Sequence, residues 1–218
     1  MKNIFRQFTK NDFFKNVNLH IHSTYSDGRV EFNELIKQAK ELNLKYYSIT
    51  DHNSIEGYKH LEKMPDGLIV GVEFDCFFDL NLPHILGYNV DINNPELNAL
   101  TTKFEKGIME VPKRILTSRN PKKVIDAIHS AGGIAVLAHP CCYWCLSLDR
   151  FIQKLVKMGL DGVEVYYPYD RITRIVKFHS RKTVKKLAEK YNLLLTGGED
   201  QHYSLFSMEK NVNWDRIL

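Results

Sequence analysis

The sequence predicts a single α/β domain built around a mostly parallel sheet. Seven stretches with β character alternate with amphipathic stretches whose apolar residues recur at helical spacing. This alternation is typical of strand–helix–strand units, which build parallel sheets. A chain of 218 residues, of which 44% are hydrophobic, suits one domain with a sizeable core. The alternation fits an open doubly wound sheet as well as a closed barrel.

The first half of the chain supplies four of the strands. One amphipathic stretch places Leu35, Ala39 and Leu42 on one face of a helix. The turn region between the third and fourth strands is too short for another helix of that length. The predicted elements are strand 17–22, a helix near 31–43, strand 45–50, a short helix near 54–62, strand 68–74 and strand 84–90.

Proline and glycine mark helix boundaries in the second half. Pro121 suits the first turn of a helix whose apolar face carries Val124 and Ile128. Gly132 and Gly133 end that helix. The remaining predicted elements are strand 133–139, helix 149–158, strand 162–167, a long helix near 171–191 and strand 193–197.

Two regions of the single domain, 1–218, are harder to assign. Residues 91–120 form an insert between two predicted strands, where it could cap a site at the strand ends. Lys113 and Arg114 in this insert are either phosphate contacts or a solvated pair on a surface helix. Residues 203–218 are expected to form a docked C-terminal tail.

His20 and His22 at the end of the first strand are the most informative residues. Alternate side chains of a strand point to the same face, so the two imidazoles point the same way. Two converging imidazole nitrogens form a good half-site for Zn, Mn or Fe. Asp27 follows in a Ser-Asp-Gly turn that could return a carboxylate to the same place. The structural alternative is a strand with one histidine in the core and the other at the surface.

Further imidazoles and carboxylates stand at the edges of the predicted strands. Six of the nine histidines fall at such edges, where a core residue would more usually be Val or Ile. Buried His and Asp need partners, and a shared metal cluster would supply them all together. The spacing therefore predicts metal binding. Besides His20, His22 and Asp27, the residues concerned are Asp51, His52, Glu73, His84, His139, Asp200 and His202.

These residues lie in short segments spread from residue 18 to residue 202. The segments are Leu19-His20-Ile21-His22-Ser23 with Ser26-Asp27-Gly28, Ile49-Thr50-Asp51-His52-Asn53, Gly71-Val72-Glu73, His84-Ile85-Leu86-Gly87-Tyr88, Ala138-His139-Pro140, Gly162-Val163-Glu164-Val165-Tyr166-Tyr167-Pro168 and Thr196-Gly197-Gly198-Glu199-Asp200-Gln201-His202. In content and order they resemble the polymerase and histidinol phosphatase family, the PHP domain. The resemblance covers nearly the whole chain and points to the small stand-alone phosphoesterases of that family.

The resemblance implies a distorted seven-stranded (β/α)7 barrel, similar to a TIM barrel. Barrel enzymes place their chemistry at the carboxyl ends of the strands, where most of these residues fall. His84 is the exception, because it begins its strand. We therefore expect the strand of His84 to be irregular or to run in the opposite direction.

The resemblance also implies two or three divalent metal ions, Zn, Mn or Fe, and nine ligands. Glu73 would bridge the first and second ions, and a hydroxide shared between them would attack the phosphate ester. Asp51 would orient a ligand or, equally, cap a loop. The implied sets are His20, His22, Glu73 and Asp200 for one ion, Glu73, His84 and His139 for the second, and Asp27, His52 and His202 for the third.

The predicted function is a metal-dependent phosphoesterase acting on a nucleotide or a short oligonucleotide. Histidinol phosphate is the alternative substrate. A catalytically silent metal-binding accessory module and a metal-dependent hydrolase of another bond are the alternative functions. No stable protein partner and no membrane partner are expected.

Two departures from the family pattern bear on substrate recognition. Nucleotide-acting members often have Gly-Ser-Asp where this chain has Gly198-Glu199-Asp200. They also tend to carry an Arg, a bidentate phosphate clamp, soon after the His-Pro pair, where this chain has Cys141 and Cys142. Arg171 or Arg174 could take over that contact. The metal ligands are unaffected.

The cysteines and the basic helix each allow two interpretations. Cys141, Cys142 and Cys145 are either reduced thiols in a loop or regulatory thiols beside the metals. The predicted helix 171–191 carries eight Lys or Arg residues between 171 and 190 against one acid, Glu189. It is either a solvated outer face or a track for an oligonucleotide backbone.

The expected location is cytoplasmic. No apolar run approaches the 18 residues that a membrane span needs. The first 15 residues mix Lys, Arg, Asp and Phe without the apolar run of a secretory signal.

Overall fold

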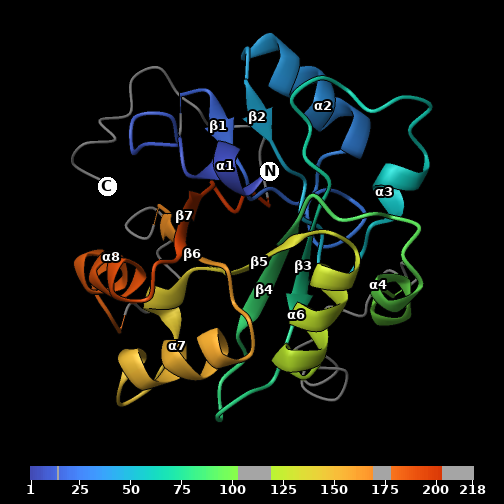
Figure 1. The fold of residues 1–218 in the computed structure, drawn as a ribbon. Helices are drawn as coiled ribbons and strands as arrows, with labels where there is room; N and C mark the ends of the chain where they lie inside the picture. Colours follow the sequence, from blue (N-terminus) through green and yellow to red (C-terminus); the bar gives the residue numbers. More distant parts are fainter. Residues whose placement is uncertain (14, 103–118, 169–177, 203–218) are drawn as a thin grey trace.

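The computed structural model describes residues 1–13, 15–102, 119–168 and 178–202. These residues form a mixed α/β fold, which confirms the predicted class. The strands lie in the middle, with the longer helices around the outside (Figure 1). Those helices are α2 (Phe32–Glu41), α6 (Pro121–Ser130), α7 (Leu148–Lys157) and α8 (Arg181–Lys190).

The main sheet has five strands, and one of them is reversed. β4 is antiparallel to β3 and β5, whereas β5, β6 and β7 are parallel to one another. Asp75 at the end of β3 therefore stands opposite His84 at the start of β4, which confirms the expected reversal. In order, the strands are β3 (Gly71–Asp75), β4 (His84–Tyr88), β5 (Ile134–Leu137), β6 (Gly162–Tyr166) and β7 (Leu194–Gly197).

Two short strands, β1 (Val17–Asn18) and β2 (Tyr46–Tyr47), form a separate parallel pair. Among the described residues the hydrogen-bonded ladders do not close into one seven-stranded sheet, so the closed barrel stays a prediction. Isolated bridges nevertheless join the pair to the main sheet on both sides: Ile21 with Gln201, Tyr47 with Leu68, and His52 with Glu73.

The first strand is shorter than predicted, because its regular pairing with β2 ends at Asn18. Beyond Asn18 the chain hydrogen-bonds toward β7: the Leu19 N–H donates to the Gly197 carbonyl at 3.1 Å. The His22 N–H donates to the Gln201 carbonyl at 3.1 Å. The segment with the two histidines is thereby held between β2 and the residues that follow β7.

Side-chain caps set where the helices begin. The Ser180 hydroxyl accepts from the Thr183 N–H, so α8 begins at Arg181 and residues 178–180 are not helical. The predicted helix near 171–191 is therefore wrong for residues 178–180. Residues 169–177 lie outside the described ranges. The shorter helices are α1 (Lys2–Phe5), α3 (Glu56–Lys59), α4 (Pro95–Leu100) and the 3₁₀ turn η1 (Pro140–Cys142).

Aromatic side chains attach the N-terminal residues to the strands. The Phe5 ring packs edge-on against Tyr88 of β4 at 5.4 Å, and the Phe13 ring stacks on Tyr166 of β6 at 5.0 Å. Burying each such ring contributes about 1.5–3 kcal/mol. The Tyr88 hydroxyl also donates to the Leu19 carbonyl at 3.0 Å, directly before His20. None of the described helices is long and apolar enough to cross a membrane.

Candidate metal centre

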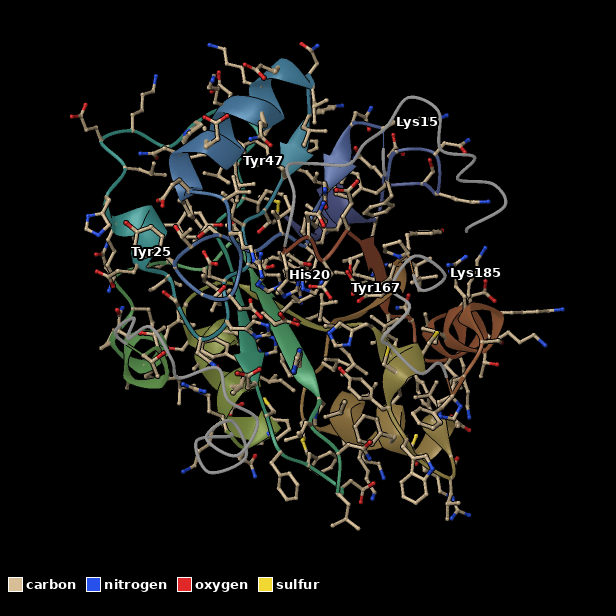
Figure 2. All side chains as sticks on the ribbon, turned by 180° about the vertical axis from the view of Figure 1, so that it is seen from behind. Lys15, His20, Tyr25, Tyr47, Tyr167 and Lys185 are labelled. Atoms are coloured by element: carbon tan, nitrogen blue, oxygen red, sulfur yellow. The ribbon has the colours of Figure 1, made fainter. Side chains whose placement is uncertain are left out.

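The nine predicted ligands come from segments far apart in the sequence and gather in one place. Figure 2 shows His20 in the middle of the molecule with Tyr167 beside it. Within three overlapping groups, the donor atoms lie within 4.8 Å of one another. The groups are His20, His22, Glu73 and Asp200; His52, Glu73 and His84; and His22, Asp27, His52 and His202.

The first group matches the first predicted ligand set. His20 Nε2 lies 3.3 Å from Glu73 Oε2 and 3.3 Å from Asp200 Oδ1. His22 Nε2 lies 3.3 Å from the same Glu73 oxygen and 3.0 Å from the same Asp200 oxygen. Two imidazoles and two carboxylates thus face one point.

Glu73 also faces the second predicted set with its other oxygen. Glu73 Oε1 lies 2.9 Å from His84 Nδ1 and 3.4 Å from His139 Nε2. The structure adds His52, whose Nε2 lies 3.4 Å from Glu73 Oε2. Both oxygens of this one carboxylate are therefore surrounded by imidazoles, as a bridging ligand requires.

Asp27 gathers the third predicted set. His202 Nε2 lies 3.2 Å and His52 Nε2 3.8 Å from Asp27 Oδ2. The structure adds His22, whose Nδ1 lies 3.7 Å from Asp27 Oδ1. A neutral imidazole has a single lone pair, so His22 can serve either this group or the first as a ligand, but not both.

Glycine lets the end of β7 approach the histidine segment. A Cβ on Gly198 would collide with the backbone of His20. The missing side chain brings Asp200 close enough for its N–H to donate to the His20 carbonyl at 2.8 Å. A further hydrogen bond, from the Glu199 N–H to Asn18 Oδ1 at 3.1 Å, keeps the same two segments together.

The clustered charges shift one another's pKa values. Burial raises the pKa of Glu73, but the attraction of His20, His52 and His84 outweighs burial and holds it well below its usual range. Burial likewise raises the pKa of Asp200, and the histidines lower it further than burial raises it. Burial lowers the pKa of His22, yet Asp200 and Glu73 raise it to about 10. The cluster thus favours positive charge close to its carboxylates.

Buried polar atoms in this cluster make no hydrogen bond within the described chain. They are Nε2 of His20, both ring nitrogens of His22, Nδ1 of His52 and Oε2 of Glu73. Leaving such atoms unsatisfied is costly, and coordination of a cation satisfies imidazole and carboxylate together. Six imidazoles and three carboxylates suit Zn, Mn and Fe. The residues therefore fit divalent metal ions.

Asp51, one of the predicted site residues outside the ligand sets, belongs to none of the three groups. The Asp51 carboxylate accepts hydrogen bonds from the Ser23 N–H at 2.7 Å, the Ser23 hydroxyl at 2.6 Å and the Ser26 hydroxyl at 2.6 Å. These contacts favour the loop-cap interpretation, and any catalytic role stays a prediction. Arg171 and Arg174 lie outside the described residues, as do Lys113 and Arg114.

The four cysteines belong to none of the three groups. All four thiols are free, and Cys141 is buried. Burial raises the pKa of Cys145, whose Sγ lies 3.4 Å from His179 Nε2. A raised pKa leaves less reactive thiolate, which favours the interpretation as reduced loop thiols. The regulatory role stays a prediction.

Three buried side chains around the centre were not predicted as site residues. The Glu164 carboxylate contacts His20 Nδ1 at 3.0 Å. Asp75 Oδ1 lies 3.2 Å from His52 Nδ1, and the Tyr167 hydroxyl donates to Asp200. An acid inside an otherwise apolar strand, as in Gly162-Val163-Glu164-Val165, is the signal that could have found Glu164.

Comparisons with known proteins agree with this geometry. A model of the PHP domain family matches residues 18–203. The 5′-3′ exoribonuclease Rnm of Escherichia coli is 31% identical over 255 aligned positions, covering 84% of this chain and 84% of that protein. A phosphoribosyl 1,2-cyclic phosphate 1,2-diphosphodiesterase of Eggerthella lenta is 23% identical, covering 84% of this chain and 93% of that protein.

The fold is also similar to a solved structure. A candidate metal-dependent phosphoesterase from Bifidobacterium adolescentis superimposes with a TM-score of 0.70 at 21% identity, covering 85% of this chain and 87% of the other. The family model spans every residue of the cluster, from His20 to His202. The chain belongs to the PHP domain family.

Proposed function

We propose that this protein hydrolyses phosphate esters of nucleotides or short oligonucleotides with two or three divalent metal ions, Zn, Mn or Fe. As a member of the PHP family it is a hydrolase acting on phosphate ester bonds. The observation that carries the metal-dependent chemistry is the clustering of six imidazoles with three carboxylates, one of which is Glu73. The nucleotide class is supported by relatives that are an exoribonuclease and a cyclic phosphate diesterase.

The proposed ligands divide around Glu73. Its Oε2 belongs to the first set and its Oε1 to the second, so the carboxylate joins the two. Asp27 serves the third set with the imidazoles that face it. The sets are His20, His22, Glu73 and Asp200; Glu73, His84 and His139; and Asp27, His52 and His202.

Divalent ions bound here would supply Lewis acidity and lower the pKa of coordinated water, so the chain needs no Ser or Cys nucleophile. The chain's own residues hold the geometry for this chemistry. Three carboxylates offset the positive charge, and the imidazoles present neutral nitrogen donors between them. Tyr167 fixes Asp200 by donating to Oδ2, which leaves Oδ1 facing His20 and His22.

The test is phosphate release by Mn-, Zn- and Fe-loaded protein. The panel contains 3′,5′-bisphosphonucleotides, 5′-phosphorylated oligonucleotides and histidinol phosphate. His22→Ala is the inactive control, and His60→Ala, an exposed histidine outside the cluster, is the matched control. We expect turnover of a nucleotide class that His22→Ala abolishes and His60→Ala preserves.

Two other outcomes would count against the proposal. Turnover of histidinol phosphate alone would replace the nucleotide class with the alternative substrate. Stoichiometric metal, measured by elemental analysis, without any turnover would favour the silent accessory module.

A further inference from the structure

Glu164 is a buried carboxylate at the back of the metal centre. It lies in the middle of β6, and its side chain is fully buried. Among the described residues, no lysine or arginine forms an ion pair with it, so its ionic partner is His20 alone. Burying a charge in this way is costly unless the charge is paired and hydrogen-bonded.

The first hydrogen bond fixes the proton on His20. Glu164 Oε1 lies 3.0 Å from His20 Nδ1. An ionised carboxylate only accepts, so His20 Nδ1 donates and carries the hydrogen. In the neutral ring, the lone pair then belongs to Nε2, which lies 3.3 Å from both Glu73 Oε2 and Asp200 Oδ1. This is the tautomer that a ligand binding through Nε2 requires.

The second hydrogen bond holds the backbone of His139. Glu164 Oε2 accepts from the His139 N–H at 2.9 Å. His139 has φ 28° and ψ 55°, a left-handed conformation that is unfavourable for a residue with a side chain. The bond holds His139 in this conformation, in which its Nε2 lies 3.4 Å from Glu73 Oε1.

We infer that Glu164 is a positioning residue of the metal centre. One carboxylate sets the tautomer of His20 and the backbone of His139, two candidate ligands on either side of Glu73. This inference rests on the proposed metal-dependent function, because it concerns the ligands of that site. It adds a residue that contacts no proposed ion and acts through two residues that do.

Glu164→Gln is the discriminating variant because it keeps size and removes charge. The Gln amide can accept at only one of its two ends, so the variant loses either the His20 or the His139 contact in each orientation. If the amide nitrogen faces His20, it favours the tautomer with hydrogen on Nε2, which opposes metal binding. We expect Zn²⁺ affinity to fall about 10–100-fold, the usual range for a residue behind a ligand.

Asp161→Asn is the matched control. Asp161 immediately precedes β6, and its Oδ2 accepts from the Ala135 N–H at 2.9 Å and lies 2.7 Å from His129 Nε2. Like Glu164 it contacts one backbone amide and one imidazole, and it also pairs with Lys2, but it makes no contact with the metal centre. We expect Asp161→Asn to leave Zn²⁺ affinity unchanged.

The experiment measures Zn²⁺ binding by calorimetry and the ring ¹⁵N shifts of His20 by NMR, all on the full chain. Wild-type protein should show hydrogen on Nδ1 of His20, and Glu164→Gln should lose that signature if its amide nitrogen faces His20. Wild-type His20 with hydrogen on Nε2 and none on Nδ1 would overturn the inference without any variant, so a Gln variant that fails to fold does not leave it untested. Unchanged affinity and tautomer in Glu164→Gln would overturn it as well.

Failure of this inference is distinguishable from failure of the proposed function. Wild-type turnover with an unaffected Glu164→Gln variant removes only the role of Glu164. Wild-type protein that binds Zn²⁺ and shows the expected tautomer, yet hydrolyses nothing, removes the phosphoesterase and keeps the positioning role.

Discussion

The Tyr167 hydroxyl donates a 2.8 Å hydrogen bond to Oδ2 of Asp200. The other carboxylate oxygen, Oδ1, is thereby left to face His20 and His22 at 3.3 and 3.0 Å. Tyr167 is fully buried and its ring lies beside His139, with centroids 5.5 Å apart. The phenol therefore orients a candidate ligand from behind while filling space next to another.

Tyr167→Phe should weaken metal binding without unfolding the protein. The ring remains to fill its space, and only the contact with Asp200 is lost, so we expect affinity for Zn²⁺ or Mn²⁺ to fall about 10-fold. Tyr58→Phe is the control, because the Tyr58 hydroxyl donates to the Ile49 carbonyl, outside the centre. Equal metal affinity in the two variants, measured by calorimetry, would show that the Asp200 contact is unimportant.

Glu73→Gln should remove metal binding and activity together. Its two oxygens face five imidazoles, so loss of its charge affects the first and second ligand sets at once. We expect the loss of affinity to exceed the roughly 10–100-fold typical of residues behind a ligand. Metal content after dialysis and phosphate release measure the two effects. Glu189→Gln, at an exposed position of α8, should change neither. Full metal content in Glu73→Gln would contradict the bridging role.

Asp51→Ala should destabilise the loop that carries Asp27. The substitution leaves the Ser23 N–H and the hydroxyls of Ser23 and Ser26 without their acceptor. Each buried unsatisfied donor costs about 1–3 kcal/mol, so we expect the free energy of unfolding to fall by at least ~2 kcal/mol. Urea unfolding measures this change. A variant with unchanged stability but no activity would instead support a direct catalytic role for Asp51.

Asp161→Asn should reduce stability in a pH-dependent way. Burial raises the pKa of Asp161, but Lys2, the Ala135 N–H and His129 outweigh it and lower the pKa below its ordinary value. A carboxyl with a lowered folded-state pKa stabilises the protein above its unfolded pKa, and this contribution disappears as pH falls through the folded pKa. We expect Asp161→Asn to lose about 1–2 kcal/mol at pH 5–6, as charge-assisted hydrogen bonds at a partly exposed site would give.

The same difference should shrink steadily below about pH 4, near the ordinary pKa of Asp. Urea unfolding of both proteins between pH 3 and pH 6 measures it. A stability difference that is constant over this range would show that the carboxylate's charge is irrelevant there.

The sequence predicted which imidazoles and carboxylates cluster, because these residues stand at the edges of the predicted strands. His84 illustrates how far this reasoning reaches: its place at the start of a strand predicted an irregular or reversed strand, and β4 is reversed. Sequence spacing could not show that His22 and His52 each lie in two of the overlapping groups. That sharing depends on how each imidazole is placed between two carboxylates in three dimensions.

Residues that act from behind the ligands were harder to predict. Asp75 and Glu164 lie within strands β3 and β6, and although an acid in an apolar strand is unusual, only the folded geometry shows which imidazole each one faces. The extent of the strands was also overestimated, because the regular pairing of β1 with β2 covers only two residues. Hydrophobic pattern predicts extended backbone there, but not which neighbour it pairs with.

The positions of the two candidate ligands on the β3–β4 hairpin do not depend on the length of the loop that joins the strands. Glu73 and His84 are held by the paired strands, whereas Asp79 and Leu80 at the tip have positive φ angles, and Leu80 is 86% exposed. Lengthening such a loop costs little closure entropy. Relatives with longer hairpins could therefore carry extra recognition elements there, and a reporter group inserted at the tip would leave the chemistry undisturbed.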